Sequence, residues 1–315
     1  MAERVARGEC FLQNAQALAK AVLGFFDSSA DAKRVVRDAP MYLLLVASIA
    51  LHQRASYAGH GNGSAETDRT AGVTLTNLCE LFALPRMPAE TPTTSQSGAI
   101  AGQTQVQDML YWARLRGLLV PTTEMGLPSD RRVQRLEPAP PLVKMFRDWI
   151  GAFMTTNLFA WPTPREADGS PPAWLVTEVL ALRIDAFRHD AFVLTERHPA
   201  IQQIMMRRHG YQMFLRLVAD LEVRPTQAAT AEAAVNVSSI ASQFDVSRGT
   251  VRNVLSLVSE LGWIDPTATD SGKARYNVTE KFLETTRQWM ALELTWMNGL
   301  AWSAFHRYEK SMLGC

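Results

Sequence analysis

The sequence has few cysteines and almost no net charge. Three cysteines (Cys10, Cys79 and Cys315) occur in 315 residues, and their spacing fits neither a disulfide framework nor a zinc site. The formal net charge of +1 argues against a generally basic surface for nonspecific binding of nucleic acid. Contacts with nucleic acid are therefore expected only from local basic patches. The cysteine usage also fits a reducing cytoplasm, where we expect the chain to act.

Long hydrophobic runs and catalytic motifs are also missing. The most apolar run, residues 41–51, is too short to cross a bilayer, and the first residues lack the apolar segment of a signal peptide. There is no Gly-rich loop after a strand, no GxSxG and no HExxH. Six histidines share no metal-ligand spacing: His52, His60, His189, His198, His209 and His306. We therefore expect a soluble protein with no membrane partner, metal, cofactor or enzymatic activity.

One stretch, residues 235–279, has the order of a helix-turn-helix followed by a wing. We expect Ser238 and Ser247 to cap the two helices, because a serine hydroxyl accepts a backbone N–H that the first helical turn leaves unpaired. Gly262 then ends the second helix as a left-handed residue. Apolar residues at helical spacing form the inner faces: Ile240, Ala241 and Phe244 in the first helix, and Val251, Val254, Leu255, Val258 and Leu261 in the second.

The outer side of the second helix is polar and basic. Its candidate DNA-binding residues suit phosphates and base edges in a major groove: Ser247, Arg248, Thr250, Arg252, Asn253 and Ser256. Short strands are expected at residues 235–237, 263–264 and 274–278, with a polar turn between the last two as the wing. Lys273 and Arg275 of this wing are placed to contact a minor groove or a phosphate backbone. The alternative is an ordinary helical domain with solvated arginines.

The chain contains this pattern twice. VTLTNLCELFAL at residues 73–84 matches VNVSSIASQFDV at 235–246, and VQDMLYWARLRGLL from Val106 matches VRNVLSLVSELGWI from Val251. The offset falls from 162 to 145, so the first copy holds 17 more residues, which lie in its turn. The repeat predicts a mostly α-helical chain with small β-wings. It would comprise two tandem winged helix-turn-helix domains related by a pseudo-twofold axis, residues 1–160 and 174–315, joined by a Pro-rich linker at 161–173.

The first copy adds its own candidates. Its reading helix is expected to begin between residues 95 and 103 and to end at Arg116, and its wing at residues 129–138 is rich in arginine. The candidate DNA-binding residues here are Gln105, Gln107, Arg131 and Arg132, with Asp108, Arg114 and Arg135 beside them. For the wing, an ordinary Arg-rich hairpin is the alternative. Cys79 aligns with Ala241 and is expected to be a small buried core residue.

Further helices are expected around both copies, at residues 10–26, 30–36, 173–193, 199–208, 213–221 and 280–310. The last contains a stripe of aromatic residues: Trp289, Trp296, Trp302, Phe305 and Tyr308. Such a stripe is more typical of a core or an inter-domain seam. The other interpretation is a pocket lined by Trp and Met that binds a small apolar effector.

The wings resemble those of MarR-type winged-helix transcriptional regulators. SDRRVQRLEP at residues 129–138 is similar to that family's wing, with an aspartate and arginines near the hairpin tip before the return strand. DSGKARYNVTEKF at residues 270–282 is a looser match. The resemblance implies flanking helices that form a dimer-like interface, and DNA contacts from residues 247–256 and the wing arginines. The insertion in the first turn departs from the family pattern.

Together these patterns predict a sequence-specific regulator of transcription that binds double-stranded DNA. As a single-chain pseudo-dimer it would place two unlike reading helices about 34 Å apart, on an imperfect palindrome; a homodimer is the other oligomeric state considered. Three alternatives stay open. One is a plasmid-type replication initiator with tandem winged helices, although its usual basicity is missing. Another is a winged-helix protein-interaction scaffold, which the near-neutral charge favours. The third is an enzyme such as a methyltransferase with a winged-helix domain, for which the repeat leaves no room.

Overall fold

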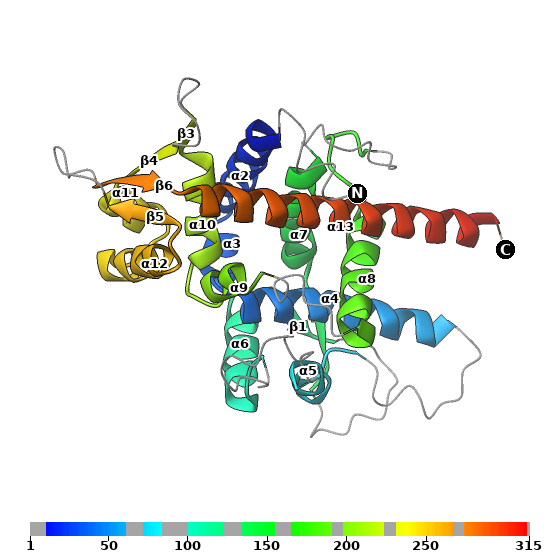
Figure 1. Ribbon diagram of the computed structural model, residues 1–315. Coiled ribbons are helices and arrows are strands. Elements are labelled where there is room, and N and C mark those ends of the chain that lie inside the picture. The colour runs from blue at the N-terminus through cyan, green and yellow to red at the C-terminus, as the bar shows by residue number, and fades with distance from the viewer. Residues whose placement is uncertain are drawn as a thin grey trace. The chain divides into compact units, whose positions relative to one another are not determined.

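The computed structural model describes residues 11–60, 72–83, 100–122, 134–154, 165–190, 198–223, 231–266 and 274–313. In these ranges the chain is mostly helical and carries two small antiparallel sheets (Figure 1). The predicted fold class is confirmed at this level. None of the described helices is long and apolar enough to span a membrane.

The order of elements in the first half of the chain recurs in the second half. The first half comprises α2 (Phe11–Ser28), α3 (Ala30–Val35), α4 (Ala39–His60), α5 (Leu75–Phe82), α6 (Gln103–Leu115), β1 (Leu119–Pro121), β2 (Leu136–Pro138) and α7 (Pro140–Met154). The second half comprises α8 (Ala173–Asp190), α9 (Pro199–Met205), α10 (Gly210–Ala219), β3 (Leu221–Val223), β4 (Ala231–Val235), α11 (Val237–Gln243), α12 (Arg248–Glu260), β5 (Ile264–Pro266), β6 (Ala274–Val278) and α13 (Glu280–Leu313). The second half differs by its strands β3 and β4.

The chain divides into two compact units that are not continuous in sequence. Unit 1 consists of Met1–Ala39, Gly151–Trp161 and Arg197–Gly299, and unit 2 consists of Pro40–Ile150, Pro162–Glu196 and Leu300–Cys315. Helices α2 and α3 therefore belong with α10 to β6, and α8 belongs with α4 to β2. The continuous domains 1–160 and 174–315 expected from the sequence differ from these units, because proximity along the chain does not determine which helices pack together.

In unit 1 the first helix of the chain packs on α10. The two helices lie side by side in Figure 1, with α2 in dark blue and α10 in yellow-green. Leu18 and Val22 of α2 are fully buried, as are Phe214 and Val218 of α10. Gln16 also donates from Nε2 to the carbonyl oxygen of Leu221 at 2.7 Å. Burial of each such apolar side chain stabilises the unit by about 1.5–3 kcal/mol, so these contacts tie the start of the chain to its second half.

The sheet of unit 1 has the strand order β3-β4-β6-β5, with every neighbouring pair antiparallel. The expected strand at residues 274–278 is confirmed as β6, and the strand expected at 263–264 is β5, which begins at Ile264 and extends to Pro266. The short strand expected at residues 235–237 has other bounds in the structure, because β4 ends at Val235 and α11 begins at Val237. Strand β3 and the rest of β4 lie where the end of a helix and a connector were expected. Strand β4 reads AEAAV, with a single β-branched residue, so its composition gives little strand signal.

Unit 2 is built around α4, which packs with α7 and α8. Tyr42 of α4 lies against Phe146 and Trp149 of α7, with ring centroids 5.9 and 5.6 Å away. The guanidinium of Arg183 on α8 lies 5.4 Å from the ring centroid of Tyr42. On the same helices, Gln53 donates from Nε2 to Glu178 at 2.7 Å. These polar and aromatic contacts fix α8 of the second half in the unit formed by the first half.

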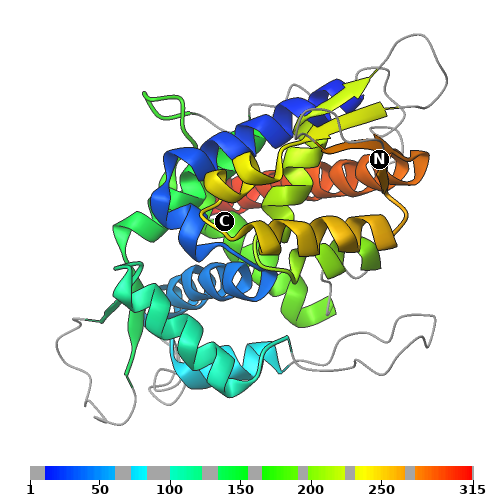
Figure 2. The same ribbon diagram turned by 90° about the vertical axis from the view of Figure 1, so that its left-hand side faces the viewer.

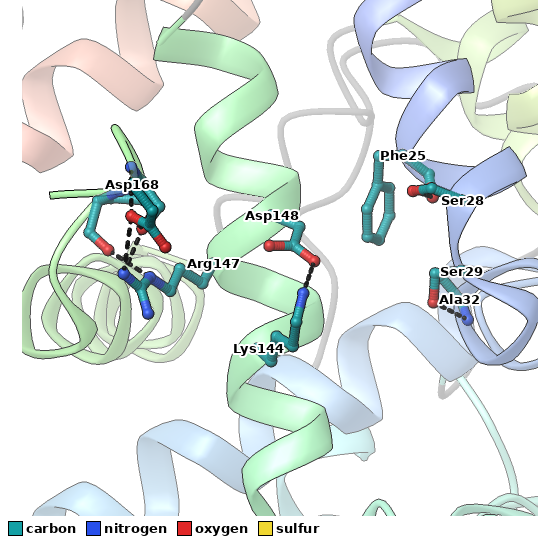
Figure 3. A network of polar contacts seen from close by, with 10 residues as sticks. Phe25, Ser28, Ser29, Ala32, Lys144, Arg147, Asp148 and Asp168 are labelled. Carbon is teal, nitrogen blue, oxygen red and sulfur yellow. Dashed lines mark hydrogen bonds and ion pairs between the residues drawn. The ribbon is translucent and has the colours of Figure 1, made fainter. Parts of the chain in front are cut away.

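A turn in the expected linker is anchored to α7 (Figure 3). Arg147 donates from Nε to the carbonyl oxygen of Pro171 at 2.8 Å, and its Nη2 faces Asp168 at 3.4 Å. The pKa of Asp168 lies below its usual value, first because the Ser170 hydroxyl donates to its carboxylate and then because the Ser170 backbone N–H does so. Residues 165–172 thus form a structured turn within unit 2.

Candidate nucleic-acid interface

The two helices of the motif in unit 1 begin at polar caps. Ser247 accepts a hydrogen bond from the backbone N–H of Thr250 at 3.0 Å, which confirms the predicted cap of α12. The predicted cap at Ser238 is wrong. Asn236 caps α11 instead, and its Oδ1 accepts from the backbone N–H of Ser239 at 3.0 Å. Asparagine serves this role as well as serine does, and Asn236 is extended, so the helix begins earlier than expected.

Left-handed backbone geometry sets both ends of α12. Asp245, in the turn that precedes the helix, has a φ of 53°, a conformation that aspartate tolerates better than most residues. Gly262, after the helix, has a φ of 68° as predicted, and Gly117 after α6 has a φ of 65°. The turn and the glycine fix the direction in which α12 leaves α11.

One face of α12 is buried and the other is open to solvent. Val251, Val254, Leu255 and Val258 are buried as predicted, and Leu261 is half-buried. Figure 2 turns this side of unit 1 toward the viewer, with α12 in gold across the front. The exposed candidates are Ser247, Arg248, Arg252, Asn253 and Ser256, whereas Thr250 is half-buried and its hydroxyl contacts that of Ser247 at 3.0 Å.

The exposed face of α12 is cationic in its first half. Arg248 and Arg252 form no ion pair within the part of the chain that the structure describes. The nearest carboxylate before the helix, Asp245, faces Arg34 at 3.8 Å. Glu260 at the far end accepts from the Ser256 hydroxyl at 3.1 Å. Both guanidinium groups are therefore available to an external anion, near the helix end where the backbone dipole is positive.

The segments expected to form wings lie only partly within the described residues. Arg275 lies in β6, where its backbone is opposite Ala234 of β4. Lys273, Arg131 and Arg132 lie outside the described residues, so their predicted role stays a prediction. In unit 2, β1 and β2 pair with Leu119 opposite Pro138. An isolated bridge between Val73 and Leu136 stands where β4 pairs with β6 in unit 1.

The corresponding helix of unit 2, α6, presents a different surface. It runs over Gln103–Leu115, as predicted, and exposes Gln105, Gln107 and Asp108. In the repeat alignment Gln103 and Gln107 stand where α12 has Arg248 and Arg252. Helix α6 therefore has no cation at either position.

Further along α6 the exposed residues are apolar. The side chains of Tyr111, Leu115 and Trp112 are 62%, 59% and 43% exposed. In the alignment Tyr111 and Leu115 replace the polar Ser256 and Glu260 of α12. This face was not predicted from the sequence, although the alignment of the two helices contains its signal.

A buried histidine supports the turn before α12. His209 is 3% exposed, has a left-handed backbone with a φ of 58°, and its Nδ1 contacts Oε1 of Gln212. Gln212 donates from Nε2 to the carbonyl oxygen of Val36 at 3.1 Å, which fixes the orientation of the amide. Oε1 therefore faces the histidine, and Nδ1 carries the proton. Burial lowers the pKa of His209 below its ordinary value of 6.5.

Two other expected features have mixed outcomes. Cys79 is half-buried rather than fully buried, and burial raises the pKa of its thiol.

Within the aromatic stripe of α13, Trp289 is in the core of unit 1, whereas Trp302 and Tyr308 are each 39% exposed. Tyr308 stacks on Trp174 of α8 at 4.1 Å in unit 2. An effector pocket along this stripe stays a prediction.

Comparison of the chain with known proteins gives no match. No protein-family model matches it, and neither a curated protein nor a solved structure is significantly similar. The resemblance to the MarR type therefore rests on the sequence patterns of the helices and wings.

Proposed function

We propose that the chain is a sequence-specific regulator of transcription that binds double-stranded DNA, with α12 as its principal reading helix. The observation that supports this most is the exposed face of α12, where Arg248 and Arg252 have no carboxylate partner among the described residues. A helix with a capped start, a buried apolar face and an open cationic face has what a major-groove reader needs.

The residues of this face suit different parts of a duplex. Arginine forms paired hydrogen bonds with O6 and N7 of guanine, and asparagine with N6 and N7 of adenine, each pair worth about 1–3 kcal/mol of discrimination. Arg252 and Asn253 are exposed one turn into the helix, where reading helices touch bases. Arg248 and the hydroxyl of Ser247, at the helix start, are placed for phosphates.

The repeated order of elements supports a pair of winged helix-turn-helix domains in one chain, with α6 as the second reading helix. Because Gln103 and Gln107 replace the two arginines of α12, its half-site contributes less to the affinity. We therefore propose an imperfect palindrome with unequal half-sites for a single-chain pseudo-dimer in the cytoplasm.

Selection from a pool of randomised duplexes tests this function with the full chain. We expect enrichment of a motif with one strong and one weak half. The affinity for the selected duplex should fall steeply with added salt, since phosphate contacts release counterions. If no motif is enriched and no duplex binds in a salt-dependent manner, the DNA-binding proposal is rejected.

One observation favours a second function, a protein-interaction scaffold. The apolar residues exposed on α6, led by Tyr111, suit a protein partner better than a phosphate backbone. A chain that selects no duplex, yet binds another protein through α6, would have this function instead.

A further inference from the structure

Among the described residues, helix α6 carries an exposed apolar surface that the proposed DNA contacts do not use. We call Tyr111, Trp112 and Leu115 the aromatic face; their exposed fractions are 62%, 43% and 59%. Tyr111 and Trp112 contact each other edge to face, with ring centroids 6.0 Å apart. Adjacent exposed side chains of this size mark interaction sites more often than ordinary surface, and tyrosine and tryptophan are enriched at protein interfaces.

Opposite charges flank Tyr111 at equal distances along the helix. Asp108 precedes Tyr111 by three residues and Arg114 follows it by three, so all three lie on one side of the helix. Arg114 donates from Nη1 to the neutral amide of Gln134 at 2.8 Å, a contact that leaves its charge in place. Within the described ranges Asp108 has no ion-pair partner.

We propose that α6 is the contact surface for a second copy of this chain. The two α6 helices would run antiparallel about a twofold axis at Tyr111. Each residue before Tyr111 then faces the equivalent residue after Tyr111 in the other copy. Asp108 of each copy meets Arg114 of the other, so the same ion pair forms twice, as a twofold interface requires.

Charge complementarity favours a second copy of the chain over other binding partners of α6. An apolar helix face with a carboxylate beside it is a poorer match for a phosphate backbone than for a protein surface. A different protein would require only some complement, with no need for opposite charges at matched distances from one residue. The arrangement Asp108, Tyr111, Arg114 is complementary to itself when reversed.

Pairing has a consequence for the proposed regulator but does not depend on it. An α6 helix covered by a second copy is not free to enter a groove. The copies would therefore pair through α6 in the DNA-free chain, while α12 in unit 1 stays open in each copy.

Sedimentation velocity of the full chain over a range of concentrations tests the pairing. We expect a reversible dimer for the wild type. Tyr111→Ala should weaken it by about tenfold or more, the scale of a central interface residue. The matched control is Lys144→Ala, an exposed residue of α7, which should leave the dimer unchanged.

Charge exchange makes the test specific. D108R puts arginine, and R114D puts aspartate, at both ends of the proposed contact, so each variant alone should stay monomeric. An equal mixture of the two should dimerise again, because both contacts then join opposite charges. Circular dichroism checks that each variant folds, which we expect since both side chains are exposed.

The remaining outcomes overturn the proposal. They are a wild type that stays monomeric at all concentrations, single variants that still pair, or folded variants whose mixture does not pair. A folded wild-type monomer that binds only a different protein through α6 would equally overturn it. None of these results bears on whether α12 binds a duplex, so the failure of this proposal is distinct from the failure of the proposed function.

Discussion

The imidazole ring of His209 stacks on the ring of Phe244, with the two planes 12° apart and the centroids at 6.3 Å. His209 precedes α10, and Phe244 ends α11 directly before the turn that leads to α12. Gln212 links the same histidine to Val36, at the end of α3. Three segments that are far apart in the sequence therefore meet at the base of the proposed reading helix.

The histidine predicts a loss of stability in mild acid. Burial is the main cause that lowers the pKa of His209, and the cations Arg208 and Arg37 lower it further, against Gln212 and Asp38, which raise it. As the pH falls below the ordinary histidine pKa of 6.5, the His209 ring takes up a proton in the unfolded chain. In the folded chain the pKa is lower, so the ring stays neutral to a lower pH. Stability contributed by the neutral ring is thus present above pH 6.5 and falls as the pH falls below it.

Urea denaturation at pH 7.5, 6.5 and 5.5 measures this effect. The His209→Gln variant should lose part of the pH dependence, because its side chain does not titrate. Ser238→Ala, an exposed change that removes no titratable group, is the control and should keep the wild-type pH dependence. Equal pH dependence in all three proteins would contradict the assignment to His209.

The caps of the motif predict different costs for neighbouring substitutions. Asn236→Ala and Ser247→Ala each remove a hydrogen bond to a helix start and should lower the free energy of unfolding by about 0.5–2 kcal/mol. Ser238→Ala removes an exposed hydroxyl inside the first turn and should change it by less than about 0.5 kcal/mol. Thermal and urea denaturation of the three variants compare these values. A larger cost for Ser238→Ala than for Asn236→Ala would contradict the observed cap.

The packing of α2 on α10 predicts that the start of the chain stabilises the second half. Leu18 is 1% exposed, and Leu18→Ala should cost about 2–5 kcal/mol. Hydrogen exchange should accelerate in α10 as well as in α2. Lys20→Ala, an exposed change on the same helix, is the control and should leave exchange in α10 unaltered. Unchanged protection of α10 in a folded Leu18→Ala chain would contradict the packing.

The proposed base contacts predict a local loss of specificity. Arg252→Ala should weaken binding to the selected duplex by about 1–3 kcal/mol and relax the preference at one base pair. Arg248→Ala should lower the affinity for all duplexes alike and make that affinity less dependent on salt, since Arg248 is assigned to a phosphate. Competition binding with single-base variants of the duplex separates the two effects. The assignment fails if Arg252→Ala weakens every duplex to the same degree.

Local signals in the sequence predicted the motif well. The boundaries of α12 follow from Ser247, Gly262 and the apolar spacing between them, all of which act within a few residues. Most of strand β4 was not predicted, because AEAAV becomes a strand through its partners β3 and β6 rather than by composition. The contact of α2 with α10 was not predicted for a similar reason, since it joins residues that are about 200 positions apart.

The candidate site was also predicted only in part. Exposure of Arg248 and Arg252 follows from their positions opposite the apolar stripe of α12. His209 supports the turn before α12 through tertiary contacts that involve Val36 and Phe244, and no local sequence pattern predicts these contacts. The aromatic face of α6 could have been predicted from the repeat alignment, because Tyr111 and Leu115 stand where the other copy has Ser256 and Glu260.

The most direct test of the central claim is the affinity of the full chain for its selected duplex, measured by fluorescence anisotropy at several salt concentrations. The double variant R248A/R252A is compared with the wild type and with Lys144→Ala, which removes a cation elsewhere. We expect the double variant to bind at least about 100-fold more weakly with a reduced salt slope, and the control to bind like the wild type. Equal affinity of all three proteins, or no binding of any duplex by the wild type, would contradict the account.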